Sequence, residues 1–311
     1  MSAETVASVK VGTCLPTLSA DDPLGAWTAA LRARADAELD HVMVGDHVSF
    51  HVGFGMDGLT SAAMVLAAEP RLSVEIGIYL LALRHPVPTA RQLATISELA
   101  PGRLTVGVGV GGEDRHEIEI CEIDPATRGA RLDECMRVVR ELSTGEKVTF
   151  HGTHINVTDA QILPAIQPAI PLIVGGRSAA AVHRAGVLGD GWIGIWTSPS
   201  RFARVVDETA EIAAESGRGD VCWKHAMQVW CSFGEPEVAR DRLARSMEKL
   251  YRVPFEKFEP YSPSGSPTDV AEFLRPYVDA GCRSFNLLTV GPDAASVDGA
   301  AEVRSLLNTC R

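Results

Sequence analysis

Short apolar segments alternate with longer segments of helical periodicity along almost the whole chain, and this alternation restricts the fold more than any other feature. Eight strands are expected, at residues 9–14, 41–44, 72–81, 104–108, 172–174, 192–195, 225–232 and 284–288. Helices are expected at residues 22–39, 59–69, 87–99, 129–143, 178–188, 200–216, 236–250, 268–280 and 297–307. The strand segments are almost continuously apolar, as in parallel strands that are buried on both faces. Eight strand-then-helix units in 311 residues predict a (β/α)8 TIM barrel, with residues 1–311 forming a single domain.

One stretch interrupts this alternation. Residues 148–150 and 155–157 flank the sequence His151-Gly152-Thr153-His154, and three prolines stand between positions 164 and 171. This pattern predicts an excursion hairpin between the fourth helix, at residues 129–143, and the fifth strand, at residues 172–174.

The charge balance excludes some classes of partner. The chain has 29 Lys and Arg against 40 Asp and Glu, a formal net charge of −11. Binding to nucleic acid or to an anionic membrane surface needs a concentrated basic patch, so neither partner is expected. The longest apolar stretch, at residues 76–83, is far shorter than the roughly 18 residues of a membrane span. The seven scattered cysteines contain no C-x-x-C pair and the N-terminus has no secretory signal, so we expect a soluble cytoplasmic protein.

The carboxyl ends of the strands are where a barrel of this kind carries its chemistry. Gly45-Asp46-His47 follows the second expected strand. A carboxylate beside an imidazole at a strand end can set the tautomer of the ring and supply a proton donor near pH 7. A turn with a helix-capping aspartate and a structural histidine explains the same residues, so both interpretations stay open. His47 and His51 are four residues apart, but glycines at positions 53 and 55 argue against a metal-binding helix, and no metal site is expected.

A glycine-rich segment, Gly107 to Glu113, follows the fourth expected strand. Its spacing fits G-x-G-x-x-G, but a dinucleotide-binding motif needs a further strand, and here Pro125 and a helix come next. We interpret the glycines as positions where the backbone approaches a flat ligand closely. Glu113 is a candidate acid or base, and an ordinary surface carboxylate is an equal alternative.

Gly175-Gly176-Arg177-Ser178 follows the fifth expected strand and opens directly into a helix. Free N–H groups, the positive end of the helix dipole and a guanidinium together favour a phosphate site. An ordinary turn with a serine cap is the alternative. Thr197, after the sixth strand, is expected to add a hydroxyl to the same phosphate.

Taken in order, these segments resemble the bacterial luciferase-like monooxygenase superfamily, whose members include flavin-dependent monooxygenases and enzymes of the 8-hydroxy-5-deazaflavin coenzyme F-420. The resemblance covers nearly the whole chain. It rests on Gly45-Asp46-His47, Arg84-His85-Pro86, Gln92-Leu93-Ala94-Thr95, Pro101-Gly102-Arg103-Leu104, Gly107-Val108-Gly109, Arg128-Gly129-Ala130-Arg131-Leu132-Asp133-Glu134, Val148-Thr149-Phe150-His151-Gly152, Val174-Gly175-Gly176, Asp190-Gly191-Trp192, Gly265-Ser266-Pro267, Asp269-Val270-Ala271 and Ala280-Gly281.

The resemblance implies a site at the carboxyl ends of the strands, with the flavin-type ring lying across them. Asp46 and His47 would lie over the reactive edge of the ring, with His47 protonating the transferred group or stabilising charge on it. Tyr79-Leu80 matches the position where the family often has a non-prolyl cis peptide behind the ring. The ring and its ribityl chain would be bordered by Gly109, Val110, Gly111 and Glu113, and the phosphate by Gly175, Gly176 and Arg177. Gly112 stands where many relatives have an aromatic residue, which leaves the substrate side open.

The function that the resemblance implies is hydride transfer between coenzyme F-420 and a small organic substrate. An FMNH2-dependent two-component monooxygenase that uses O2 is the alternative, because it would employ the same residues. A non-catalytic cofactor-binding paralogue is a second alternative, although it would have no physical need of both the Asp46–His47 pair and the turn at residues 175–177. Members of this family commonly pair, so a homodimer is expected.

Overall fold

The structure is a computed structural model that describes residues 8–16, 21–50, 55–111 and 114–309. Within these residues, eight parallel strands form a closed (β/α)8 barrel in the order β9, β11, β1, β2, β3, β4, β7, β8, with β8 also pairing with β9. The strands are β1 (Lys10–Cys14), β2 (His41–Val44), β3 (Ser73–Tyr79), β4 (Leu104–Val108), β7 (Leu172–Gly175), β8 (Gly191–Ile195), β9 (Ala226–Phe233) and β11 (Ser284–Thr289). The predicted fold class is confirmed.

Helices follow the strands nearly where the sequence predicts them. They are α1 (Pro23–Asp36), α2 (Gly58–Ala68), α3 (Pro86–Leu99), α5 (Arg128–Ser143), α6 (Ala179–Leu188), α7 (Pro199–Glu215), α8 (Pro236–Tyr251), α9 (Pro267–Asp279) and α10 (Asp293–Asn308). Helix α10 begins four residues earlier than expected, directly after Pro292. Five short elements were not predicted, namely α4 (Arg115–Glu119), β10 (Ser264–Gly265) and the 3-10 helices Leu81–Leu83, Phe255–Lys257 and Glu259–Tyr261.

The chain divides into two compact units. The first unit comprises Met1–Met43, Gly194–Glu208 and Lys224–Arg311, and the second comprises Val44–Ile193 and Thr209–Trp223. In the first unit, β1 and β9 pair with the two sides of β11, and Val11, Phe285 and Leu287 are fully buried. Arg34 is buried beside this sheet, where its guanidinium donates to Thr13 Oγ1 at 2.9 Å and forms an ion pair with Asp293. Burial of these apolar strands is the main favourable term in folding this unit.

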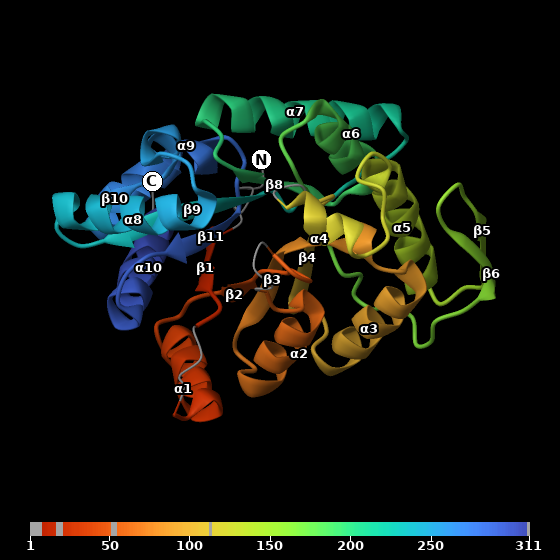
Figure 1. Cartoon of the computed structure of the whole chain (residues 1–311), viewed down its shortest axis with the longest axis horizontal. Coiled ribbons are helices and arrows are strands. Elements are labelled where there is room, and N and C mark those ends of the chain that lie inside the picture. The colour runs from red at the N-terminus through yellow and green to blue at the C-terminus, as the bar shows by residue number, and fades with distance from the viewer. Residues whose placement is uncertain (1–7, 17–20, 51–54, 112–113, 310–311) are drawn as a thin grey trace, which may run out of the picture. The chain divides into compact units, whose positions relative to one another are not determined.

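The second unit contains the predicted excursion hairpin, which is formed by β5 (Val148–His151) and β6 (Asn156–Ala160). Figure 1 shows the hairpin beside α5. Glu134 on α5 holds the turn of the hairpin, because its carboxylate accepts hydrogen bonds of 2.8 Å from the backbone N–H groups of Thr153, His154 and Ile155. The expected hairpin is therefore confirmed, and one helix residue fixes its position.

Strand β3 carries an irregularity that shapes its neighbours in the second unit. The non-prolyl cis peptide bond lies between Gly77 and Ile78, so the expectation of one at Tyr79-Leu80 is wrong by two residues. The pairing register with β4 shifts between Ile76 and Tyr79 at the same place. A Cβ added at Gly109 would lie 2.8 Å from Cγ2 of Ile78, and one added at Gly175 would lie 2.6 Å from its Cδ1. These glycines are thus required by packing inside the protein, a reason that the sequence did not indicate.

Candidate functional site

Asp46, directly after β2, is a buried anchor of the backbone around it. Its Oδ1 accepts hydrogen bonds from the Gly58 N–H and from Arg84 Nη2, both at 2.8 Å. Its Oδ2 accepts from the Leu80 N–H and from Arg84 Nη1, also at 2.8 Å. The side chain is 0% exposed, and burial raises the pKa of Asp46 while the charge of Arg84 opposes that rise. Asp46 therefore ties together the ends of β2 and β3 and the start of α2.

Arg84 completes this anchor from the other side. Its guanidinium also donates to Asp57 Oδ2 at 3.1 Å, and its Cζ lies 4.4 Å from the centroid of the Tyr79 ring. Asp57 caps α2 by accepting from the Thr60 N–H at 2.8 Å. Bidentate pairing of this kind gives both geometric specificity and energy. Arg84 was noted in the sequence only as part of a motif, and its role as the partner of Asp46 was not predicted.

His47, the next residue, has a different carboxylate partner. Its Nδ1 lies 3.0 Å from Oε2 of Glu117, while Oε1 of Glu117 accepts the N–H groups of Val48 at 2.6 Å and Ser49 at 2.9 Å. The Glu117 side chain is 4% exposed and that of His47 is 36% exposed. The Phe50 ring packs on the imidazole with centroids 4.3 Å apart. The imidazole is therefore held on one side and open on another, as a proton donor or acceptor must be.

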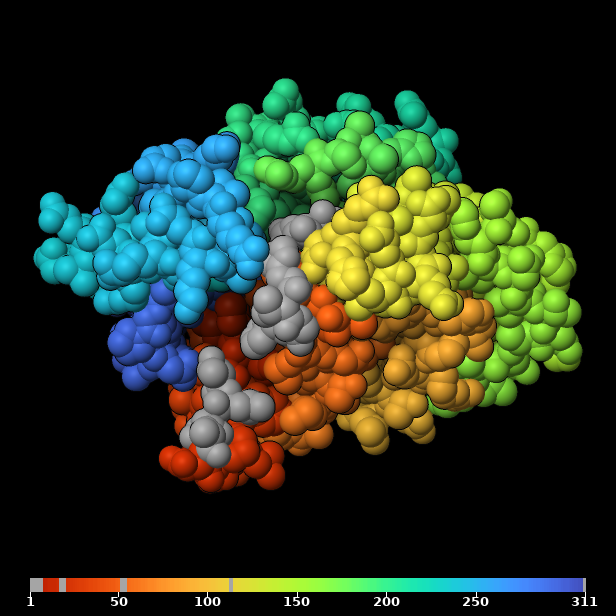
Figure 2. All heavy atoms as spheres, viewed as in Figure 1, coloured from red at the N-terminus to blue at the C-terminus, as the bar shows by residue number. Residues whose placement is uncertain are grey.

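Glu117 contacts His47 because α4, which carries Glu117, packs closely against its neighbours within the second unit. Asp114 caps the helix by accepting from the His116 N–H at 3.0 Å. Ile118, next to Glu117, is 2% exposed and packs in a cluster with Leu80 and Leu83. Figure 2 shows the yellow segment around α4 against the orange atoms that follow β2. Glu117 was not predicted as a site residue, although the pattern Asp114-x-x-Glu117 before an apolar residue is a signal of a helix start.

The residues after β3 and β4 that were predicted to border a cofactor ring differ in burial. Tyr79 and Leu80 are buried, and burial raises the pKa of Tyr79 to about 12. The Gly109 N–H donates to the Tyr79 carbonyl at 3.3 Å, which joins the two strand ends. Val110 and Gly111 are half-buried, and Gly111 adopts a φ of +68°. Gly112 and Glu113 lie outside the described residues.

The turn after β7 opens into the start of α6 as predicted. Gly176 has a φ of +123°, and its carbonyl accepts from Trp192 Nε1 at 2.8 Å. Ser178 caps the helix by accepting from the Ala181 N–H at 3.2 Å. Residues 176–180 are exposed, so the first turn of a ten-residue helix and the Arg177 side chain both face solvent. Exposed N–H groups at a helix start beside a guanidinium suit an anionic group.

Thr197, the further residue assigned to the phosphate, belongs to the first unit. Its side chain is buried, and its carbonyl accepts a hydrogen bond of 2.6 Å from the Tyr277 hydroxyl. A role for Thr197 toward a phosphate stays a prediction.

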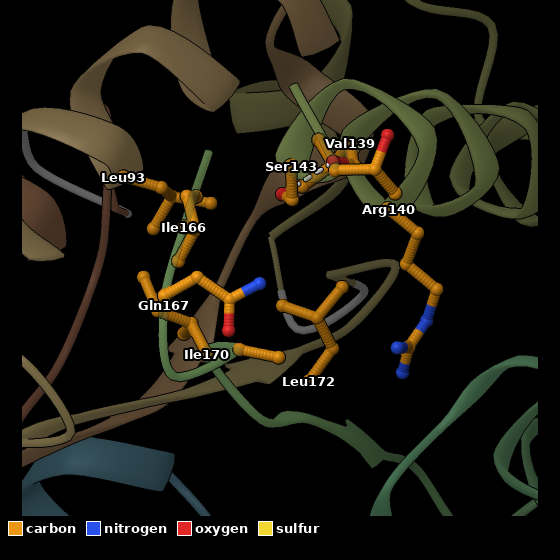
Figure 3. A pocket seen from close by; sticks show the side chains of 10 residues that line it. Leu93, Val139, Arg140, Ser143, Ile166, Gln167, Ile170 and Leu172 are labelled. Atoms are coloured by element: carbon orange, nitrogen blue, oxygen red, sulfur yellow. Dashed lines mark hydrogen bonds between the residues drawn. The ribbon is translucent and has the colours of Figure 1, made fainter. Parts of the chain in front are cut away.

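A cavity of about 340 Å³ lies away from all of these residues, at the opposite end of β7 (Figure 3). It is lined by Leu93, Val139, Arg140, Ser143, Thr144, Ile166, Gln167, Ala169, Ile170 and Leu172. Leu172 is the first residue of β7, whereas the predicted phosphate site begins at Gly175, the last residue of that strand. Arg140 forms an ion pair with Asp190, with Nη2 and Oδ2 2.7 Å apart. The cavity therefore takes no part in the candidate site.

The described part of the chain offers neither a metal cluster nor a membrane span. Over these residues, no group of three or more His, Cys, Asp or Glu side chains is placed to hold a metal ion. No helix among them has the length and apolar character needed to cross a membrane.

Residues 9–279 match the family model described as luciferase-like monooxygenase. An F-420-dependent glucose-6-phosphate dehydrogenase of Kineococcus radiotolerans is 27% identical over an alignment of 289 residues, and the match covers 82% of this chain and 84% of that protein. An uncharacterized protein of Mycobacterium bovis is 31% identical over 152 residues, and the match spans 49% of this chain and only 52% of that protein. The chain thus spans about half the length of some of the curated relatives that it matches.

Solved structures of other proteins share the fold, and two of them illustrate the similarity to this chain. An F-420-dependent secondary alcohol dehydrogenase, in complex with an F-420–acetone adduct, superposes with a TM-score of 0.83 over 97% of this chain and 100% of that one, at 20% identity. A monooxygenase of Streptomyces bottropensis superposes with a TM-score of 0.78 over 95% of this chain and 98% of that one, at 22% identity. At these identities the likeness shows the fold alone.

Proposed function

Because the chain belongs to the luciferase-like monooxygenase family and is a luciferase-like oxidoreductase, we propose that it transfers a hydride between coenzyme F-420 and a small organic substrate. The observation that carries this proposal is the partly exposed imidazole of His47 after β2, held at one nitrogen by Glu117. A redox step between an alcohol and a carbonyl needs one proton donor or acceptor at the substrate oxygen, and His47 suits that role.

The residues present fit an anionic deazaflavin. The exposed start of α6, with Gly175, Gly176 and Arg177, would hold its phosphate, since a local positive site is needed in a chain of net charge −11. The backbone at Tyr79-Leu80 and at Gly109, Val110 and Gly111 would border its ring. When bound, the coenzyme would supply the hydride acceptor or donor. His47 would donate or accept the proton at the substrate oxygen.

Two further residues have different parts in the proposal. We assign Asp46 to holding the backbone next to His47, because its side chain is buried and its four hydrogen bonds go to Gly58, Leu80 and Arg84. Glu113 stays a predicted acid or base. Two apolar side chains beside His47, those of Val48 and Met56, are exposed, which favours an organic substrate without charge near the reacting atom.

The choice of F-420 follows the named activity of the relative from Kineococcus radiotolerans, which matches over most of both chains. The test is a titration of the purified protein with F-420 and with FMN, followed by fluorescence. Submicromolar F-420 binding with much weaker FMN binding supports the proposal. Tight FMN binding without F-420 binding would overturn it.

The second candidate is a monooxygenase that takes reduced FMN and O2, and the family model that matches residues 9–279, described as luciferase-like monooxygenase, favours it. Oxygen uptake that depends on supplied FMNH2 would identify this activity. The His47→Gln variant tests the role of His47 in either reaction: turnover should fall while the cofactor still binds. A protein that only binds the cofactor would show no turnover in the parent chain. If turnover in this variant equals that of the parent chain while the cofactor still binds, His47 has no catalytic role.

A further inference from the structure

The carboxylate of Glu117 lies within hydrogen-bond distance of three groups, and it can only accept a hydrogen bond from each of them. Its Oε1 accepts two backbone N–H groups, those of Val48 and Ser49. Nδ1 of His47 lies 3.0 Å from Oε2 and 3.3 Å from Oε1, so Oε2 is its nearer partner. A backbone N–H has no acceptor capacity, and a carboxylate has no hydrogen to give. The hydrogen of the third contact must therefore sit on Nδ1 of His47.

We infer that Glu117 is a positioning residue that fixes His47 in the tautomer with its hydrogen on Nδ1, which leaves Nε2 as the nitrogen that exchanges a proton with the substrate. The substrate part of this inference rests on the proposed function, whereas the tautomer does not. The inference deepens that function by naming the atom of His47 that acts and the residue that selects it.

The surroundings leave the carboxylate little freedom to make other contacts. Glu117 is 4% exposed, and the neighbouring Ile118 is fastened in the cluster with Leu80 and Leu83. The two N–H groups on Oε1 set the rotation of the carboxylate plane, so Oε2 stays directed at the ring. On the other side, the Phe50 ring packs on the imidazole and limits its tilt. A carboxylate held against one ring nitrogen in this way selects one tautomer of a histidine and stabilises the imidazolium when it forms.

The proton balance with an alcohol substrate shows what this arrangement accomplishes. In the direction of oxidation, the O–H bond breaks and its proton goes to Nε2 of His47. A bound deazaflavin would accept the hydrogen of the C–H bond together with its electron pair, and a C=O bond would form on the substrate. His47 is then an imidazolium, whose Nδ1–H still donates to Glu117. Reduction of a carbonyl is the same step in reverse.

The variant Glu117→Gln tests the inference sharply. The amide oxygen must remain on the Val48 and Ser49 N–H groups, because these groups accept nothing. The amide NH2 then takes the place of Oε2 and donates to Nδ1, so the neutral ring moves its hydrogen to Nε2. A nitrogen that already carries a hydrogen cannot accept the substrate proton. We expect kcat to fall on the order of 100-fold or more, with KM and the dissociation constant of F-420 within about threefold of the parent values.

The readout independent of activity is the long-range ¹H–¹⁵N NMR spectrum of the free protein labelled with ¹⁵N-histidine, with His47 assigned by loss of its signals in His47→Gln. The parent chain should show the neutral ring with hydrogen on Nδ1, and Glu117→Gln should show it on Nε2. The matched control is Glu119→Gln on the same helix, whose exposed carboxylate pairs with Arg115, and it should change neither the tautomer nor kcat.

Hydrogen on Nε2 in the parent chain would overturn the inference, even if Glu117→Gln fails to fold. An unchanged tautomer in a folded Glu117→Gln would also overturn it, because Glu117 would then only cap the backbone at Val48 and Ser49. The expected tautomers together with no F-420 binding would instead refute the proposed function and leave the positioning role of Glu117 standing.

Discussion

The packing of Ile78 under the glycine of β7 predicts a measurable coupling between two substitutions. A Cβ at Gly175 would lie 2.6 Å from Ile78 Cδ1 and 3.1 Å from its Cγ1, whereas carbon atoms in favourable contact stand about 3.5–4.0 Å apart. The φ of Gly175 lies outside the left-handed region, so alanine is compatible with the backbone and only the contact opposes it. Overpacking of this kind costs about 1–3 kcal/mol.

Replacing Ile78 with valine removes the Cδ1 atom that causes most of this clash. On its own, Ile78→Val should lower the free energy of unfolding by about 0.5–1 kcal/mol, since the residue is half-buried. Gly175→Ala should lower it by about 2 kcal/mol. The double variant should lose only about 1–1.5 kcal/mol, which gives a coupling energy of at least about 1 kcal/mol.

Urea denaturation followed by circular dichroism measures all four chains of this cycle. Gly186→Ala is the control, because its Cβ would lie 2.6 Å from Cγ2 of Ile212, and its nearest atoms do not include any of Ile78. Its cost should persist in the presence of Ile78→Val. Additive losses in the Gly175 cycle would refute the idea that Ile78 dictates the glycine there.

Three other predictions, with four substitutions, follow from the structure. Asp46→Ala should lower the free energy of unfolding by about 3–5 kcal/mol, because it leaves the buried N–H groups of Gly58 and Leu80 without an acceptor and the half-buried Arg84 without its main partner. Asp57→Ala should lower it by only about 0.5–2 kcal/mol, through loss of a helix cap, and urea denaturation compares the two variants. Burial lowers the pKa of His225 from 6.5 to about 4, so between these pH values the unfolded chain binds a proton at this residue that the folded chain does not. Up to about 3 kcal/mol of stability should therefore be lost as the pH falls from about 6.5 to 4. Thermal unfolding of His225→Gln should lack this part of the loss, and the same pH dependence in both chains would contradict the prediction. Arg177→Ala should weaken F-420 binding roughly tenfold, as measured by fluorescence titration, with kcat nearly unchanged. An unchanged affinity would contradict an anion site at the start of α6.

The barrel could be predicted from the sequence because strands buried on both faces leave a plain apolar signal. Strands β2 and β4 have the predicted bounds, His41–Val44 and Leu104–Val108. Helix α1 begins at Pro23 after the cap residue Asp22, as its sequence indicates. The missed elements are short: α4 has five residues and β10 has two, and neither length is enough to show a periodicity.

The candidate site could be predicted in part, and the reason lies in sequence distance. His47 and the turn at residues 175–178 stand at strand ends, where a barrel fold directs attention. Their partners do not, because Glu117 is 70 residues from His47 and Arg84 is 38 residues from Asp46. Adjacency suggested that Asp46 would orient His47, but the buried carboxylate turns to Arg84 instead. The cis peptide at Gly77-Ile78 was likewise invisible, since it accompanies a register shift that only the paired strands show.

Asp46 and His47 adjoin in the chain, yet unrelated segments secure their side chains, Arg84 for one and Glu117 for the other. Val48 and Met56 contribute only backbone atoms to the hydrogen bonds around His47, and their side chains are exposed. A combinatorial library at positions 48 and 56, with proline omitted at 48, would therefore alter the surface beside the imidazole while both anchors stay in place. Under the proposed function, such a library would change substrate selectivity without changing the proton transfer at His47.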